Sequence, residues 1–327
     1  MSSAVQLLGV SNAIVDILSH VDHGFLERIG ADPGTMTLID EARADEVYGL
    51  MGPATEKSGG SVANSVAVFA GLGGSAAYIG RVADDQFGRV FQHDMDSLGI
   101  EMRVPPSPAE KSTARCYVLI TPDGQRTMQT YLGACTELGL DDVTAGTVGE
   151  PGIVLLEGYI WDLPQGPAVA DLAISTVRAN GGRVALSLSD ALCVERHRPA
   201  FRELVEEQVD IVFADEEEIY RLFATDSLEG AVSEAAMLEG LFVITRSANG
   251  SVVVNGDEFI EQAAFPVERV VDTTGAGDTY TAAFLASLVK GESLDRCARI
   301  ASWCGARVIQ QVGARYQGDI LAGYHEA

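Results

Sequence analysis

Residues 270–289 read VVDTTGAGDTYTAAFLASLV, an apolar strand end followed by a glycine-rich turn and a long, alanine-rich helical pattern. The small residues Gly275, Ala276 and Gly277 allow a ligand to approach the backbone closely. Their amide N–H groups open the predicted helix, and a helix N-terminus favours an anion because its amides are unpaired and its dipole is positive there. The stretch predicts an anion-binding turn between a strand and a helix.

Asp278 stands in the first turn of that helix, beside the predicted anion. A carboxylate next to a phosphate is unfavourable unless it acts on the nucleophile, as the base in phosphoryl transfer does when it accepts a hydroxyl proton. The alternative is structural: the glycines form a tight turn, and Asp278 only stabilises the positive end of the helix dipole. The turn alone leaves both interpretations open.

The chain between about residues 150 and 290 alternates short apolar runs with segments of helical periodicity. Runs such as GIVLLEGYI (152–160) and VDIVFADEEE (209–218) are rich in Val, Ile and Leu, as strands buried on both faces are. We therefore expect an α/β fold, a three-layer sandwich in which helices cover both faces of a mostly parallel central sheet.

A different pattern appears at residues 112–120 and 125–132, two β-rich runs on either side of Pro122-Asp123-Gly124. This arrangement predicts a hairpin, and we expect it to form a small β-sheet lid together with residues 14–40. The predicted domains are a large nucleotide-binding and catalytic domain of residues 1–13, 41–108 and 133–327, and a small β-sheet lid domain of residues 14–40 and 109–132.

A second group of small and polar residues lies near the N-terminus. Gly59 and Gly60 precede a helical pattern that carries Asn64, whose amide can donate and accept hydrogen bonds. Asn12 and Asp16 follow the first strand, and one carboxylate can accept from both hydroxyls of a vicinal diol. The alternatives are a flexible loop with a helix N-cap for the glycines, and a strand-end turn with a solvated Asp for the other pair.

Together these motifs resemble the ribokinase-like, or phosphofructokinase-B type, family of carbohydrate and nucleoside kinases. The family signature D-T-x-G-A-G-D is complete at residues 272–278, and GGS-x-x-NS at 59–65 is similar to its first motif. The resemblance implies the ribokinase-like fold, with ATP and Mg²⁺ as cofactors. It also implies that Asp278 is the catalytic base and that the amides of Gly275, Ala276 and Gly277 form an anion hole for the phosphoryl group.

The resemblance also assigns the acceptor site. Asn12 and Asp16 match an N-x-x-x-D pair with which the adenosine-kinase branch binds the ribose hydroxyls, and Gly59, Gly60 and Asn64 would complete the substrate-binding residues. The chain resembles this branch most closely. The function implied is phosphorylation of the 5′-hydroxyl of a ribonucleoside, with adenosine favoured. A kinase for ribose, fructose or 2-keto-3-deoxygluconate is the first alternative, and a non-catalytic nucleoside-binding protein is the second.

The resemblance also implies roles for three residues at the edge of the site, which would bind a cation or the ATP phosphates or cover the site. Many family members bind a monovalent cation such as K⁺ beside the signature loop, and Asp272 and Thr274 are the matching positions. Arg126, in the predicted hairpin, would reach the ATP phosphates or cover the site. The alternative for Arg126 is a solvated surface side chain, as hairpin arginines usually are.

Two turns are expected to bind ATP. Glu218 matches the acidic residue that organises the water shell of Mg²⁺, whereas Asp215 stands where the family has Asn. An acidic helix N-terminus stabilised by the dipole is the alternative for this cluster. Thr245 and Gly250 match a T-x-G-x-x-G turn, but Ser247 replaces its first Gly, so we expect a negative φ at Ser247.

The composition restricts the partners of the protein. The 47 Asp and Glu residues outnumber the 22 Lys and Arg residues, and the net charge of −25 would repel nucleic acids and anionic membranes. The N-terminus has no basic leader, no apolar run reaches about 18 residues, and five cysteines form no C-x-x-C pair. We expect a cytoplasmic monomer or homodimer that binds a small-molecule substrate, with no nucleic-acid or membrane partner.

Overall fold

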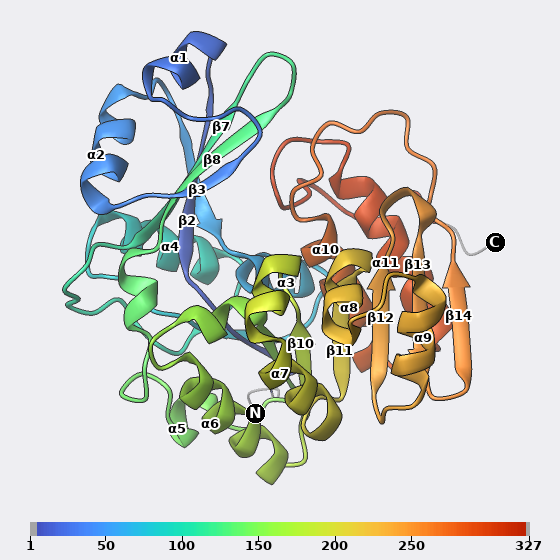
Figure 1. The fold of residues 1–327 in the computed structure, drawn as a ribbon. Coiled ribbons are helices and arrows are strands. Elements are labelled where there is room, and N and C mark those ends of the chain that lie inside the picture. The colour runs from blue at the N-terminus through green and yellow to red at the C-terminus, as the bar shows by residue number, and fades with distance from the viewer. Residues whose placement is uncertain (1–4, 325–327) are drawn as a thin grey trace.

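The computed structural model describes residues 5–324 and contains two β-sheets of unequal size (Figure 1). Within the described residues the larger sheet has nine strands, in the spatial order β14 (Glu258–Gln262), β13 (Ser251–Asn255), β12 (Leu241–Thr245), β11 (Ile211–Asp215), β10 (Arg183–Ser187), β9 (Ile153–Glu157), β1 (Leu7–Val10), β5 (Ala76–Ile79) and β6 (Glu101–Met102). Strands β12 to β6 pair in parallel, while β13 and β14 are antiparallel additions at one edge. The predicted mostly parallel sheet is confirmed.

Helices cover both faces of this sheet, which gives the three predicted layers. Because side chains alternate across a strand, Leu7 packs into the core on one face and Leu8 into the core on the other. The first face carries α3 (Ser61–Gly71), α4 (Gln86–Ser97), α10 (Ala276–Val289) and α11 (Leu294–Val308). The second carries α5 (Ala145–Val148), α6 (Gly166–Ala179), α7 (Ala191–Glu207), α8 (Glu216–Phe223) and α9 (Leu228–Ala236).

The smaller sheet has five strands within the described residues, in the order β3 (Met36–Leu38), β8 (Arg126–Tyr131), β7 (Ala114–Ile120), β2 (Ile14–His20) and β4 (Thr55–Gly59). Strands β7 and β8 form the predicted antiparallel hairpin. One face packs against α1 (His23–Arg28) and α2 (Glu41–Leu50) through Ile17 and Tyr117, and the opposite face presents Val118 and Ile120. Figure 1 shows this sheet and its two helices on one side of the molecule.

One strand of the smaller sheet lies outside the ranges that the sequence assigns to the lid. The sequence analysis places residues 41–108 in the large domain, but β4 falls within this range and pairs antiparallel with β2. The run TEKSG is polar and lacks alternating apolar residues, so only its pairing partner identifies it as a strand. The pairing sets Ile14 opposite Gly59 and brings the glycine-rich motif to the rim of the smaller sheet.

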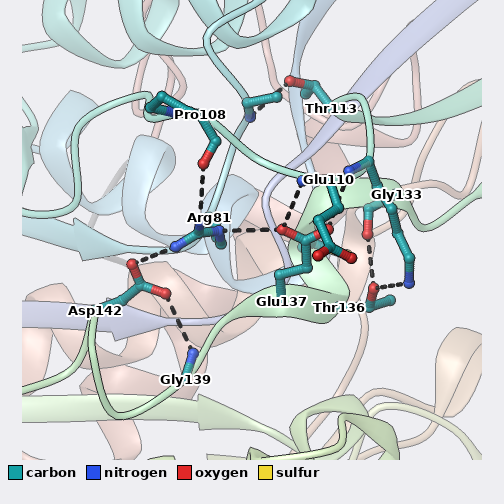
Figure 2. A network of polar contacts seen from close by, with 12 residues as sticks. Arg81, Pro108, Glu110, Thr113, Gly133, Thr136, Glu137, Gly139 and Asp142 are labelled. Carbon is teal, nitrogen blue, oxygen red and sulfur yellow. Dashed lines mark hydrogen bonds and ion pairs between the residues drawn. The ribbon is translucent and has the colours of Figure 1, made fainter.

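Arg81 ties together two of the chain segments that connect the body with the smaller sheet, those that precede β7 and follow β8 (Figure 2). Its guanidinium donates to Asp142 at 2.6 Å and to the Pro108 carbonyl at 3.2 Å, and it lies 3.7 Å from Glu137. Glu137 in turn accepts from the main-chain amide of Lys111 at 3.0 Å. One side chain therefore holds both connecting segments, the second of which contains the 3₁₀ turn η1 (Gly133–Glu137).

Two findings bear on the surroundings of the chain. All five cysteines are buried and unpaired. Among the helices of residues 5–324, none combines the length and the apolar character needed to cross a bilayer. Residence in the cytoplasm stays a prediction.

Candidate active site

A cavity of about 250 Å³ lies between the smaller sheet and the chain that follows α11. Polar side chains from both parts of the molecule meet there, and the smaller sheet adds an apolar wall of Leu18, Val118 and Ile120. We call it the smaller cavity. Its polar lining includes Asp16, Asn64, Arg126, Thr274 and Arg315.

A cavity of about 790 Å³, the larger cavity, opens at the carboxyl ends of β11 and β12 and at the start of α10. Binding sites of open α/β sheets lie at this position. It is lined by the candidate residues Asp215, Glu218, Thr245, Gly250, Ala276, Gly277 and Asp278. Asp278 lines the larger cavity and accepts a hydrogen bond from Asn64, which lines the smaller one, so this contact lies between the two cavities.

Asp278 is held by α3. Ser61 Oγ donates to its Oδ1 at 2.7 Å, and Asn64 Nδ2 donates to its Oδ2 at 3.1 Å. Burial raises the pKa of Asp278 to about 6, while the two hydrogen bonds and the nearby Arg315 act in the opposite direction. The carboxylate is therefore ionised at neutral pH and has a pKa suited to accepting a proton.

The helix that carries Asp278 begins where the sequence predicts, but the segment before the glycine turn is not the predicted strand. Helix α10 begins at Ala276, and its N-cap Gly275 has φ +72°, where a Cβ would lie 2.2 Å from the Ala314 carbonyl oxygen. A Cβ on Gly277 would meet no atom within 4 Å. The predicted strand at 270–271 is wrong: the chain there is a loop that pairs with the end of α11, since the Val271 amide donates to the Ile309 carbonyl at 2.8 Å.

The N-terminal candidates assemble beside the smaller cavity. A Cβ on Gly59 would lie 2.3 Å from the Asp16 carboxyl group, and one on Gly60, at φ +95°, would lie 2.6 Å from the Asn12 carbonyl oxygen. Gly60 therefore allows a close approach of two backbone segments, and Gly59 leaves the room that the Asp16 carboxyl group occupies. Burial raises the pKa of Asp16 to about 7. Among the described residues, the buried Oδ1 of Asn12 has no hydrogen-bond partner, so a ligand hydroxyl can satisfy it.

The acidic cluster at the larger cavity forms a reciprocal cap on α8. Asp215 Oδ1 accepts from the Glu218 amide at 2.8 Å, and Glu218 Oε2 accepts from the Asp215 amide at 2.9 Å. Asp215, in place of the usual Asn, thus serves as the N-cap of α8. Burial, and then the charge of Asp215, raise the pKa of Glu218 to about 8.

The turn after β12 corrects one expectation. Ser247, in the 3₁₀ turn η3 (Ser247–Asn249), has φ +50°, not the negative φ expected for a residue that replaces glycine. The left-handed conformation is open to serine at a modest free-energy cost, and the turn imposes it. Gly250, at φ +84°, is required, because a Cβ there would lie 2.0 Å from the Gln262 carbonyl oxygen.

Asp272 braces the signature loop. Its Oδ1 accepts from the Thr274 amide at 2.7 Å, its Oδ2 accepts from the Gly313 amide at 2.7 Å, and the carboxylate also pairs with Arg126. Arg126 therefore lies in the smaller cavity and does not line the larger one, unlike a side chain that reaches ATP phosphates. Both oxygens of the Asp272 carboxylate thus have partners within the protein, and its role as a ligand of K⁺ stays a prediction.

A family model for pfkB family carbohydrate kinases matches residues 30–319. The chain belongs to the pfkB carbohydrate kinase family. The solved structure of adenosine kinase from Sinorhizobium meliloti is 42% identical, with a TM-score of 0.89 over 98% of both chains. That of a probable sugar kinase from Rhizobium etli is 40% identical, with a TM-score of 0.88 over 97% of this chain and 96% of the other. Ribokinase from Arabidopsis thaliana is 28% identical over 79% of this chain and 68% of its own length.

This pfkB-family kinase is therefore a phosphotransferase that acts on a hydroxyl group, and its family implies the use of ATP. Its relatives include kinases named for adenosine and kinases named for sugars, so the family alone leaves the acceptor open. The fold of the kinase, with its second, smaller sheet, agrees with these solved structures.

The sequence analysis missed two residues of the site, the partly buried Arg315 and the buried Glu157. Arg315, after α11, donates to Asn64 Oδ1 at 2.9 Å. Glu157, at the end of β9, accepts from the Asn12 amide at 3.0 Å and from the Val62 amide at 3.4 Å, and burial raises its pKa to about 7. No local motif identifies either one. The available signals were a charged residue ending an apolar strand and an arginine directly after Gly313-Ala314.

Proposed function

We propose that this kinase transfers the γ-phosphoryl group of ATP to the 5′-hydroxyl of a ribonucleoside and that adenosine is its preferred acceptor. The observation that carries the proposal is the position of Asp278, a partly buried carboxylate with a pKa of about 6 that lines the larger cavity and bonds to Asn64 of the smaller one. The acceptor would occupy the smaller cavity and ATP the larger one. An ionised base between the two substrates is what transfer to a hydroxyl requires.

In the proposed reaction Asp278 accepts the proton of the acceptor hydroxyl as its oxygen forms a bond to the γ-phosphorus. The bond between this phosphorus and the β,γ-bridging oxygen breaks, and its electron pair leaves with ADP. The amides of Gly275, Ala276 and Gly277 stabilise the transferring group, although the Ala276 amide is partly engaged by the Thr273 carbonyl at 3.2 Å. Catalysis comes mainly from positioning and electrostatics.

The acceptor would be held by the residues of the motifs near the N-terminus. Asp16 and the unpaired Oδ1 of Asn12 would accept from the ribose hydroxyls, and Gly59 and Gly60 leave the room for this contact. The apolar wall of Leu18, Val118 and Ile120 suits the face of a purine base. Arg126, at the rim, would cover the bound acceptor.

The nucleotide would lie over Thr245 and Gly250, with its phosphates toward α10. A magnesium ion fits at Glu218, because this carboxylate lines the larger cavity and, among the described residues, only its Oε2 accepts a hydrogen bond, which leaves Oε1 for a metal-bound water. When bound, Mg²⁺ neutralises phosphate charge during transfer. At the signature loop, the Thr274 carbonyl stays the candidate for a K⁺ contact, and the reaction described above does not depend on K⁺.

A sugar kinase is the second candidate, and one observation favours it. Of the described residues that line the smaller cavity, none is Phe, Tyr or Trp, so no large aromatic ring is available to stack on a base. The volume of about 250 Å³ also suits a single sugar ring. The 40% identity to a protein described as a probable sugar kinase agrees with this candidate.

The deciding experiment measures ADP release from ATP and Mg²⁺ with adenosine, guanosine, inosine, cytidine, ribose, fructose and 2-keto-3-deoxygluconate, each with and without K⁺. We expect adenosine to give the highest kcat/KM and 2′-deoxyadenosine to lose much of it, because the diol contact is removed. A sugar as the best acceptor would overturn the nucleoside assignment and keep Asp278 as base. If no acceptor gives ADP release while calorimetry shows that adenosine binds, the result would favour a non-catalytic binding protein.

A further inference from the structure

Arg315 joins three separate elements at one guanidinium group. Its Nε donates to Asn64 Oδ1 on α3 at 2.9 Å. Its Nη1 donates to Ser58 Oγ on β4 at 2.9 Å and to Asp94 Oδ2 on α4 at 3.1 Å. The side chain is only 16% exposed, so the ion pair with Asp94 offsets the burial of its charge. The planar fork of an arginine suits such a convergence of acceptors.

The contact with Arg315 selects one orientation of the Asn64 amide. With Oδ1 accepting from Arg315, Nδ2 faces Asp278 and donates to its Oδ2 at 3.1 Å. Only the nitrogen of an amide donates and only its oxygen accepts. In the flipped orientation the Asn64 nitrogen would therefore face the N–H of Arg315, donor against donor, and its oxygen would face the Asp278 carboxylate, acceptor against acceptor. Arg315 therefore leaves a single satisfied orientation.

We infer that Arg315 is a positioning residue for phosphoryl transfer, which holds the Asn64 amide so that Nδ2 donates to Asp278. The inference rests on the proposed role of Asp278 as base. Without the fork, Asn64 can rotate, and Asp278 loses one of the two side-chain bonds that aim its carboxylate at the acceptor. A base that is misdirected by a fraction of an ångström transfers protons less efficiently.

The charged groups around Asp278 make Arg315 the cation of this cluster. The acidic groups that interact with Asp278 are Asp16 on β2 and Glu157 on β9. The neutral partners are Ser61 and Asn64 on α3, and the guanidinium of Arg315 counters the acidic charge. A substitution at Arg315 must therefore separate the effect of charge from the effect of the fork.

Arg315 can also act in a second way, which the test must distinguish. Its Nη2 is buried, has no hydrogen-bond partner among the described residues, and belongs to a residue that lines the smaller cavity. A direct bond from Nη2 to the acceptor would appear chiefly in KM, because it would be made in the ground state as well as in the transition state. A positioning role acts on kcat.

The test is a double-mutant cycle of Arg315→Lys and Asn64→Ala, with the best acceptor at saturation. Lysine keeps the positive charge and loses the fork. We expect Arg315→Lys to lower kcat about tenfold, the equivalent of one hydrogen bond to a charged group, and to change it less than about twofold when Asn64 is already Ala. An unchanged kcat, an equal fall in both backgrounds, or a rise in KM alone would overturn the inference.

The matched control is Arg115→Lys, at a buried arginine that pairs with Asp45 at 2.8 Å and lies over Phe87 and Tyr131, away from Asp278. It should leave kcat within about twofold, the range expected for a site that does not touch the chemistry. Thermal unfolding of each variant checks that it folds. If Arg315→Lys does not fold, Asp94→Asn takes its place, because it keeps Arg315 and removes the charge that anchors the fork; it should lower kcat in the same direction, and an unchanged kcat would overturn the inference.

Asp278→Asn distinguishes a failure of the proposed base from a failure of the positioning role of Arg315. If this variant keeps its turnover, the base role fails and the inference fails with it. If it is inactive while Arg315→Lys equals the wild type, the proposed function stands and only the role of Arg315 is lost.

Discussion

Asn64 donates from Nδ2 to Oδ2 of Asp278 at 3.1 Å, although 214 positions separate the two residues along the chain. The contact joins α3, which follows the N-terminal glycine motif, to the first turn of α10. Ser65 strengthens the joint, since its Oγ donates to the Asp278 main-chain carbonyl at 3.1 Å. The position of the candidate base is therefore set by a helix from the opposite end of the sequence.

Asp278→Asn should nearly abolish turnover and leave ATP binding intact, because Asn keeps the size and shape of the side chain but cannot accept the proton. A positioned base contributes about 10²- to 10⁴-fold. The measurements are kcat from ADP release and ATP affinity by calorimetry. Retention of more than about a tenth of kcat would remove Asp278 from the base role.

The pH dependence should follow the ionisation of the same carboxylate. Burial raises the pKa of Asp278 to about 6, so the ionised form that accepts a proton is lost below that pH, and kcat/KM should fall as the pH drops through about 6. Arg315→Gln removes a cation that lowers this pKa, so the acidic limb should move to higher pH. Arg115→Gln is the control and should leave it in place. If the acidic limb of the kcat/KM profile does not move in Arg315→Gln, the assignment of that limb to Asp278 is contradicted.

Gly59→Ala should weaken acceptor binding, because the added Cβ would lie 2.3 Å from the Asp16 carboxyl group and displace it. We expect KM for the acceptor to rise between about ten- and a hundredfold, the cost of misplacing a binding group by about an ångström. Gly49→Ala in α2 is the matched control, since its Cβ would meet no atom within 4 Å. An unchanged KM in Gly59→Ala would separate Asp16 from the acceptor.

Ser247→Gly should stabilise the fold by about 0.5–1 kcal/mol, because glycine adopts the left-handed conformation without the steric cost that a Cβ carries. Urea unfolding measures this change. Ala224, which ends α8 at φ 53° and ψ 42°, offers a second test of the same kind, and Ala224→Gly should act in the same direction. A loss of stability in both variants would argue against this explanation.

The glycine turn and the start of α10 could be predicted because they are local. Gly275, Ala276, Gly277 and Asp278 are adjacent, and a helix N-terminus presents amides to a ligand whatever surrounds it. The alternation of strands and helices was equally readable, since burial on both faces of a parallel sheet leaves nearly continuous apolar runs. The hairpin of β7 and β8 followed from Pro122-Asp123-Gly124.

Other features depended on partners that the local pattern does not contain. The polar strand β4 is a strand only because β2 pairs with it, and the segment before Asp272 is a loop because it pairs with the end of α11. Arg126 turned toward Asp272, a contact across 146 positions that no spacing in the hairpin indicates. The φ of Ser247 was set by its turn, against the preference of its side chain.

The sequence by itself determined the family, the α/β layers and the glycine-rich turn at the start of the helix that carries Asp278, because these depend on periodicity and on the backbone of a few adjacent residues. Only the tertiary structure decided that Asn64 points to Asp278 and that Arg315 and Glu157 belong to the site. These contacts join residues far apart in the chain. The direction of a buried polar side chain is set by the nearest group that satisfies its hydrogen bonds, and that group is known only once the helices and strands have packed.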